Sequence, residues 1–240
     1  MSKITLLFQL FAFLFATSLL QDRGSLTEDL ELVYSNVIGD STYWVAEIQQ
    51  KEGSNIQFKD NTLDIDVSKG ATVWFNQKLK GDVVIQYDIT IVDGGGDNDE
   101  VSDMNCFWMF TDPYQPDGDL QFGHSSRTGW FKTYHKLQGY YVGLGGYRNT
   151  RTRFRRYDGN FDRPLLPEHD LRDKKFMIIA NKTYTVTLVA KGEKVQYYRD
   201  DQLIFDIKDD APYREGWFAF RTLINHMRIE NFKVYMKKSS

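Results

Sequence analysis

The sequence predicts an all-β fold, a sandwich of jelly-roll type built from two antiparallel sheets. Apolar and polar residues alternate with a period of two, as in strands with one buried face, at 62–67, 83–92, 183–189 and 227–235. Residues 195–199 and 203–207 flank a turn and predict a hairpin, whereas the apolar run 105–111 predicts a strand buried on both faces. Short strands between turn residues, without sustained helical periodicity, are typical of a sandwich or jelly roll.

Length and composition indicate a single β domain, expected at 34–237 after a short N-terminal segment at 19–33. Hydrophobic residues make up 41% and aromatic residues 15% of the 240 residues, enough to fill one large core. The single cysteine, Cys106, excludes an internal disulfide framework and is expected to be buried in its apolar run. The four histidines are scattered, so no zinc site is predicted.

The N-terminus has the pattern of a signal peptide at 1–18. A short positive segment is followed by an apolar stretch from Leu6 to Ala16, and Ala16 and Ser18 place small residues before a cleavage site. The apolar stretch is short for a membrane span. We therefore expect a secreted or periplasmic protein with no stable membrane insertion after cleavage. An uncleaved anchor or a buried N-terminal helix is the alternative.

Charge is distributed unevenly along the chain, although the net charge is only −3. Residues 82–119 contain ten Asp or Glu and no Lys or Arg, whereas 121–165 contain nine Lys or Arg and two Asp. In the basic segment the arginines alternate with tyrosines. Arginine forks bind carboxylates and phosphates, and aromatic rings stack on sugars or bases. For an exported chain with a pI of about 5.8, we expect an acidic polysaccharide or oligosaccharide as partner, and no nucleic acid.

Two parts of the sequence resemble known families. Residues 184–235, with the hairpin Tyr198-Arg-Asp-Asp-Gln-Leu-Ile and the ending from Gly216-Trp-Phe to 229–235, resemble the concanavalin-like jelly rolls of sugar-processing proteins. The block VSDMNCFWMFTDP, together with RTGWF and RPLLPEHDL, is similar to an uncharacterised family of secreted bacterial proteins associated with polysaccharide degradation. The second resemblance covers 34–235. It implies a carbohydrate context but assigns no catalytic residue.

The arginines and tyrosines favour a polysaccharide lyase that cleaves beside a uronic acid by β-elimination. This reaction needs a cation that neutralises the uronate carboxylate, a base and an acid. The candidate catalytic residues are His135, Tyr140, Tyr141, Tyr147 and His226. The candidate substrate-binding residues are Asn105, Arg127, Arg148, Arg151, Arg153, Arg155 and Arg221.

Within this set, His135 and one tyrosine serve as base and acid, and Arg151 or Arg153 neutralises the carboxylate. Nearby arginines are expected to lower the pKa of the tyrosine. Tyr140 shares one strand face with Val142 and Leu144, and Tyr141 shares the other with Gly143. The arginine row has an alternative interpretation, as an edge strand protected by charge. We also expect His135→Ala to leave folding intact.

Two other functions stay open. The same groove could serve a carbohydrate-binding module without turnover, or a glycoside hydrolase could act through Asp103 or Glu168, although the Glu-x-Asp-x-Glu triplet is absent. The acidic loop 93–100 could bind Ca²⁺ near Asp97 and Asp99, or be a solvated loop. No other cofactor is expected.

Overall fold

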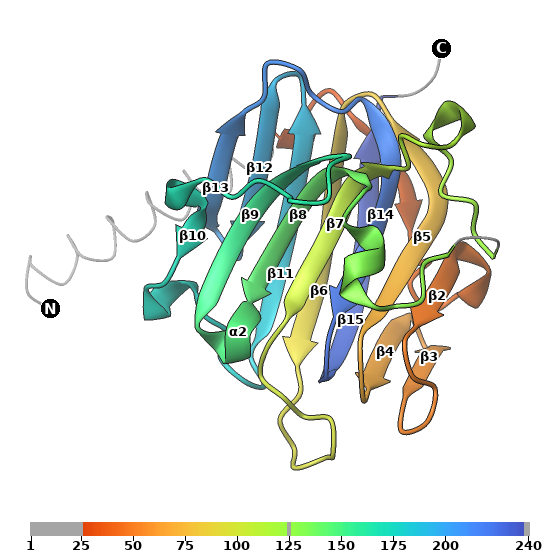
Figure 1. Cartoon of the computed structure of the whole chain (residues 1–240), viewed down its shortest axis with the longest axis vertical. Helices are drawn as coiled ribbons and strands as arrows, with labels where there is room; N and C mark the ends of the chain where they lie inside the picture. Colours follow the sequence, from red (N-terminus) through yellow and green to blue (C-terminus); the bar gives the residue numbers. More distant parts are fainter. Residues whose placement is uncertain (1–25, 124–125, 238–240) are drawn as a thin grey trace, which may run out of the picture.

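Two antiparallel sheets packed face to face make up the fold, as expected from the sequence (Figure 1). The computed structural model describes residues 26–123 and 126–237, so the signal peptide predicted at 1–18 lies outside the described residues. We call the sheet that faces the viewer in Figure 1 the front sheet and the other the back sheet. No helix in the described ranges has the length and apolarity to span a bilayer.

The front sheet has seven strands, in the order β10 (Asp170–Leu171), β9 (Arg151–Asp158), β8 (Gln138–Gly145), β7 (Met104–Thr111), β14 (Glu215–Thr222), β5 (Ala71–Lys80) and β2 (Trp44–Ile48). The back sheet runs β13 (Gln202–Lys208), β12 (Lys194–Arg199), β11 (Thr183–Lys191), β6 (Val83–Ile91), β15 (Asn225–Met236), β4 (Thr62–Val67) and β3 (Asn55–Lys59). Strand β1 (Glu31–Ser35) also pairs with β15, so the domain begins slightly before residue 34.

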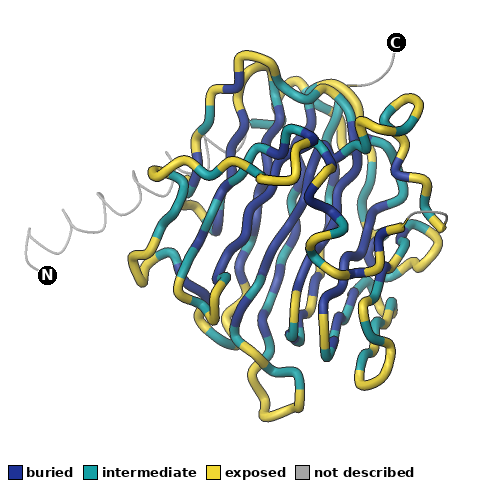
Figure 2. Tube along the Cα trace, in the orientation of Figure 1, coloured by how far each residue is buried: buried dark blue, intermediate teal, exposed yellow. Residues whose placement is uncertain are grey.

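Short helical turns lie in the connections. They are η1 (Ser41–Tyr43), η2 (Pro116–Gly118), η3 (Phe131–Tyr134), α2 (Gly146–Asn149), η4 (Pro167–His169) and η5 (Lys174–Phe176). In Figure 1, η3 lies in front of the front sheet, and Figure 2 shows that the loops are exposed while the strands are largely buried.

The main core lies between the sheets and follows the predicted alternation. In β4, Leu63, Ile65 and Val67 are buried, and the polar residues between them are partly exposed. The apolar run of β7 is buried on both faces, and Cys106 is only 1% exposed, as predicted. Burying such side chains stabilises the fold by about 1.5–3 kcal/mol each.

A bulge in β7 turns a second aromatic layer toward the outer face of the front sheet. Met109 has a φ of 55°, and the pairing with both neighbouring strands shifts register at this point. A Cβ on Gly139 or Gly216 would lie within 3 Å of the backbone of residues 109–110, so both neighbours must be glycine. The bulge lets Phe107 and Phe110 join this outer layer.

A buried carboxylate anchors the loop that covers the outer layer. Glu47 of β2 accepts hydrogen bonds from Trp74 Nε1 (2.9 Å) and Tyr134 Oη (2.8 Å), and it forms an ion pair with Arg127 (3.0 Å). Arg127 also donates to the carbonyl of Leu120. Because a buried charge is stable only when it is paired and hydrogen-bonded, these contacts fix Leu120, Arg127 and Tyr134 on the sheet. The loop forms one wall of the cleft described next.

Candidate functional site

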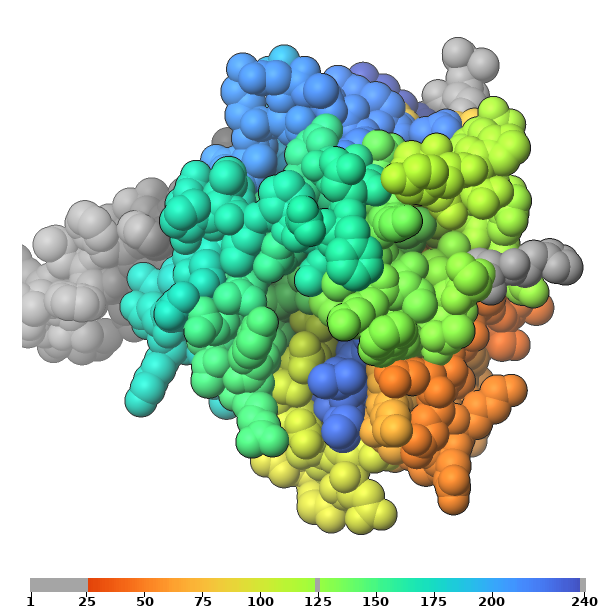
Figure 3. Space-filling model, in the orientation of Figure 1, coloured from red at the N-terminus to blue at the C-terminus, as the bar shows by residue number. Residues whose placement is uncertain are grey.

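A cleft of about 620 Å³ opens on the outer face of the front sheet. Figure 3 shows it near the centre of the molecule, between the green surface of α2 and β9 and the light-green surface of residues 127–136. Its charged lining is mostly basic and consists of Arg148, Arg151, Arg153, Arg155 and Arg163 against Glu100 and Asp103. The basic segment 121–165 therefore supplies most of the charged lining of the cleft.

Tyr141 lies on the floor of the cleft. Its hydroxyl rests over Gly143, where an added Cβ would be 2.4 Å from Tyr141 Oη. This oxygen has no hydrogen-bond partner among the described residues, although the side chain is only 7% exposed. Burial raises the pKa of Tyr141, and the nearby Tyr157 and Asp103 raise it further against the opposing effect of Arg221 and Arg163. The expected lowering of a tyrosine pKa by arginines is therefore wrong here, because burial outweighs the cations.

Asp103 is the most enclosed acid of the cleft. Its Oδ1 accepts a hydrogen bond from Asn105 Nδ2 at 3.2 Å, and its φ of 52° is uncommon for a residue with a side chain. Burial raises the pKa of Asp103, partly offset by hydrogen bonds from Asn105 and Ser102 and by the charge of Arg221. Partly buried polar residues in strained backbone conformations are frequent at functional sites.

The arginines of the cleft fall into two groups. Arg151 and Arg153 form ion pairs with Asp170 at 3.1 Å and 2.8 Å, which keeps the pKa of Asp170 well below its usual value. Arg148, Arg155 and Arg163 have no carboxylate partner within the described part of the chain, and they are the ones free to bind an anion.

Arg155 and Arg163 form a close pair. Arg155 Nη1 donates to the backbone carbonyl of Arg163, and the Arg163 guanidinium lies over the Phe131 ring at 5.0 Å. Burial, followed by the charge of Arg163, lowers the pKa of Arg155. Two like charges held together at low exposure favour binding of an anion between or beside them.

The wall opposite Phe131 is an unusual turn. Tyr147, Arg148 and Asn149 of α2 have consecutive φ values of 54°, 56° and 57°. Such a left-handed run costs about 1–2 kcal/mol per residue. The Asn149 side chain offsets part of this cost, since it both accepts from Ile178 N and donates to Ile178 O at 2.8 Å. The turn presents Tyr147, 69% exposed, with Arg153 stacked on its ring at 4.8 Å.

A family model described as a domain of unknown function, DUF6250, matches residues 65–232. The chain belongs to the DUF6250 family. No curated protein matches it.

Solved structures similar to this DUF6250 chain confirm the jelly-roll fold. A protein of unknown function with a galectin-like fold from Bacillus subtilis is 18% identical, with a TM-score of 0.62 over 87% of this chain and 100% of that one. The carbohydrate-binding module CBM66 from Bacillus subtilis is 15% identical, with a TM-score of 0.53 over 81% and 96%. An endo-β-1,3-glucanase from Pyrococcus furiosus is 10% identical, with a TM-score of 0.51 over 88% and 96%.

Several predicted site residues of the DUF6250 chain do not line the cleft. Tyr140 points into the main core, where its hydroxyl donates to Asp209 at 2.7 Å. It faces away because the alternation along β8 sends Tyr140 and Tyr141 to opposite sides, as predicted. Arg127 is committed to Glu47, and Arg221 is buried with Nη1 donating to the carbonyl of Gly129 at 2.7 Å.

Asn105 and Glu168 also have other places in the fold. Asn105 is 6% exposed and contacts the cleft only through Asp103, while its Oδ1 has no partner among the described residues. Glu168 lies in η4, is exposed and is not part of the lining. Of the two predicted hydrolase carboxylates, only Asp103 reaches the cleft.

His135 is buried beside the cleft instead of lining it. Its ring packs between Phe131 at 5.3 Å and Phe161 at 4.9 Å, and it is only 5% exposed. Neither ring nitrogen has a partner among the described residues. Burial, together with Arg163, Arg155 and Lys132, lowers the pKa of His135 to about 4. The expectation that His135→Ala leaves folding intact stays a prediction, and the packing of this ring between Phe131 and Phe161 argues against it.

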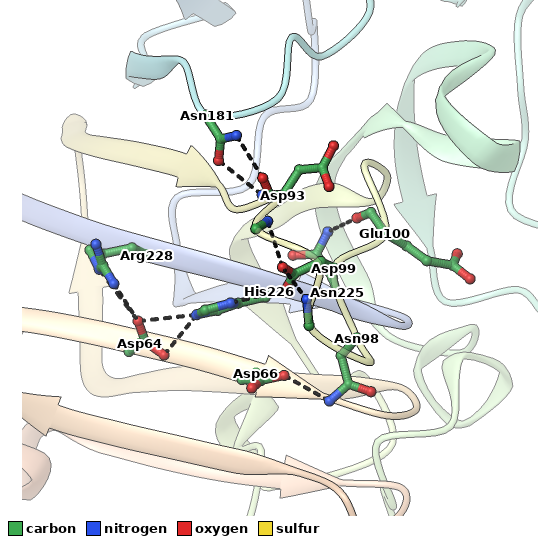
Figure 4. A network of polar contacts seen from close by, with 12 residues as sticks. Asp64, Asp66, Asp93, Asn98, Asp99, Glu100, Asn181, Asn225, His226 and Arg228 are labelled. Atoms are coloured by element: carbon green, nitrogen blue, oxygen red, sulfur yellow. Dashed lines mark hydrogen bonds and ion pairs between the residues drawn. The ribbon is translucent and has the colours of Figure 1, made fainter.

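His226 lies in the back sheet and does not face the cleft. Figure 4 shows its ring between two carboxylates, with Nε2 at 3.1 Å from Asp64 and Nδ1 at 3.1 Å from Asp99. Asp99 also accepts from the backbone N–H groups of Gly94 and Gly96, which lowers its pKa. No cluster of three metal-binding side chains is found in the described ranges, and Ca²⁺ near Asp97 and Asp99 stays a prediction.

Sequence reasoning missed three kinds of cleft residue. Arg163 ends the basic segment singled out above and could have been included with the other arginines. Phe131, the exposed Leu223 and the partly exposed Ile224 have no signal in the sequence. Glu100 belongs to the acidic loop recognised in the sequence, and it was not included among the candidate site residues because its place in the cleft depends on how this loop joins β6 of the back sheet to β7 of the front sheet.

Proposed function

We propose that this protein acts on carbohydrate and that the cleft binds an acidic saccharide through a uronate carboxylate. The observation that carries the proposal is the set of arginines without carboxylate partners among the described residues, Arg148, Arg155 and Arg163, in a cleft that also presents aromatic rings. The similar folds of a carbohydrate-binding module and of a glucanase support a saccharide as the ligand.

The chemistry of the lining suits a sugar acid. A guanidinium binds a carboxylate in a bidentate manner, and the interaction gains strength where water is partly excluded. Tyr147, which is 69% exposed, offers part of its ring at the edge of the cleft, and aromatic rings of this kind pack against the C–H faces of sugars. The paired Arg151 and Arg153 keep the same wall positively charged.

The reaction that this arrangement supports best is β-elimination. Arg155 and Arg163 would hold the uronate carboxylate and make the C5 proton more acidic. Asp103, whose raised pKa makes it a stronger base, would take that proton. The C5 electron pair would form the C4–C5 double bond as the C4–O bond breaks. Tyr141 stays protonated because its pKa is raised, and it would give its phenolic proton to the leaving oxygen.

Hydrolysis is a second candidate, favoured by one observation. Asp103 and Glu100 both line the cleft, and burial raises the pKa of Asp103, as expected for a general acid. Glu100 would then activate water or attack the sugar. A third outcome is binding alone, in which the arginines hold the glycan without turnover.

One assay separates these outcomes. Purified protein is incubated with polygalacturonate, alginate and hyaluronan, and absorbance near 235 nm is followed together with new reducing ends. Elimination gives an unsaturated product that absorbs, whereas hydrolysis gives reducing ends alone. We expect an absorbance increase with at least one polymer, lost in Arg155→Gln/Arg163→Gln. Arg214→Gln, outside the cleft, is the matched control. The proposal would be refuted if no polymer gave either product and if calorimetry detected no binding of any polymer.

Secretion belongs to the same proposal. It is supported by the signal-peptide pattern at 1–18 and by the need of such a protein to meet an extracellular polymer. Mass spectrometry of the protein recovered from the medium or periplasm of an expressing bacterium tests it. We expect the mass of a chain that starts at residue 19, and retention of the full-length chain in the cytoplasm would contradict the proposal.

A further inference from the structure

A second hollow of about 390 Å³ lies next to the cleft on the same face. Its lining includes Tyr114, Lys132, Lys136 and Phe161. In Figure 3 it is the recess bordered by the yellow-green 112–121 segment, the light-green 127–136 segment and the teal 158–166 segment. Nothing in the function proposed above uses this hollow.

Only a narrow ridge separates the hollow from the cleft. Two chain segments contribute to both sites. In the first, Phe131 lines the cleft and Lys132 lines the hollow. In the second, Arg163 lines the cleft and Phe161 lines the hollow. Between these two chain segments the ring of His135 contacts both Phe131 and Phe161. The ridge is therefore a row of three rings, and an elongated ligand in the cleft can continue over it.

The hollow has the side chains that a charged sugar needs. Tyr114 and Phe161 are 65% and 50% exposed, which leaves large aromatic faces open to solvent. Lys136 Nζ lies 6.0 Å from the Tyr114 ring centroid, and Lys132 Nζ lies 5.4 Å from the exposed Trp130 ring.

The charges around the hollow also favour an anion. Neither Lys132 nor Lys136 forms an ion pair with a carboxylate in the described ranges. Asp112, the acid among the lining residues, instead accepts a hydrogen bond from Tyr114 N and closes its own turn. Cations without partners beside exposed rings form an anionic-saccharide surface of the same kind as the cleft.

The ridge itself has unmet hydrogen-bonding capacity. Both nitrogens of His135 are buried without a partner in the described part of the chain. A buried polar group in this condition destabilises the fold. Because His135 lines neither the cleft nor the hollow, a glycan that crosses the ridge would contact the rings beside it and not these nitrogens.

We propose that the hollow is a second saccharide subsite and that one acidic glycan chain occupies the cleft and the hollow together. This inference rests on the proposed function and adds that the substrate is an oligomer or polymer, bound along its length across the ridge. Its prediction concerns chain length. Affinity increases when the chain is long enough to reach both sites, and the lysines of the hollow supply part of that increase.

Calorimetry with disaccharides and hexasaccharides of galacturonate, mannuronate and hyaluronan tests the inference. We expect the hexasaccharide of the recognised series to bind at least tenfold more tightly than its disaccharide. Lys132→Ala/Lys136→Ala should reduce that affinity about tenfold, because two exposed charge contacts are lost, and leave the disaccharide unaffected. Lys51→Ala/Lys69→Ala, outside both sites, is the control pair.

The outcomes separate the two proposals. The second subsite is overturned if both chain lengths bind with equal affinity. It is also overturned if Lys132→Ala/Lys136→Ala retains the full increase of affinity with chain length. Either result leaves the cleft proposal intact. Absence of binding by every oligosaccharide overturns both. Unchanged melting temperatures of the variants would show that the lysines act on the ligand and not on the fold of the loop.

Discussion

The burial of His135 predicts a specific loss of stability in acid. The pKa of its ring falls from 6.5 to about 4 in the folded protein, mainly through burial and then through Arg163 and Arg155. Between these pH values the unfolded chain binds a proton that the folded chain excludes. Stability from this residue is therefore complete above pH 6.5 and lost as the pH falls toward 4. The pKa difference corresponds to roughly 3 kcal/mol.

His135→Phe tests the reasoning, because phenylalanine keeps an aromatic ring between Phe131 and Phe161 but cannot bind a proton. Urea unfolding is measured for both proteins at pH 7, 5.5 and 4.5. We expect the advantage of the wild type over the variant to fall by about 2–3 kcal/mol between pH 7 and pH 4.5. His169, whose pKa burial also lowers, is present in both proteins and cancels from the comparison. A pH-independent difference between wild type and variant would refute the burial argument.

Three further predictions concern the loop anchored by Glu47, the floor of the cleft and the charge of the cleft. Glu47→Gln should lower the free energy of urea unfolding by about 3–5 kcal/mol, because it leaves the buried Arg127 without its carboxylate. Tyr141→Phe should abolish turnover in the absorbance assay while calorimetric binding persists, and Gly143→Ala should reduce turnover by displacing the hydroxyl; full activity of both would exclude Tyr141 as the acid. Glycan affinity should fall as NaCl rises, and by less in Arg155→Gln, and a salt-independent Kd would contradict recognition by cations.

The fold was largely predictable because strand alternation is a local property of the sequence. The strands at 62–67 and 183–189 follow from alternation, the hairpin from its turn residues and β7 from its continuous apolar run, and the structure extends the second strand to Lys191. The strand β14, by contrast, is buried on both faces along most of its length and gave no alternation to recognise. Which face of β8 would meet the core was also not predictable, since it depends on the partner sheet.

The site was less predictable, because it depends on contacts between distant segments. The arginine-rich segment singled out from the sequence lines much of the cleft, but the pairing of Arg153 with Asp170 depends on how β9 meets β10. His135 has polar neighbours in the sequence, yet the turn of η3 and the 159–163 loop enclose it between aromatic rings. Local sequence therefore identifies which residues can bind an anion, and only the tertiary structure shows which are free to do so.

The left-handed turn of α2 makes it feasible to separate ligand recognition from folding at one residue. Arg148 has a φ of 56°, a conformation that glycine adopts without strain. Arg148→Gly would therefore remove a cleft charge while relieving roughly 1 kcal/mol of backbone strain. When a substitution lowers both affinity and stability, the two losses are hard to distinguish. In Arg148→Gly the affinity for the glycan should fall while the stability of the fold rises, so a loss of binding could not be attributed to unfolding.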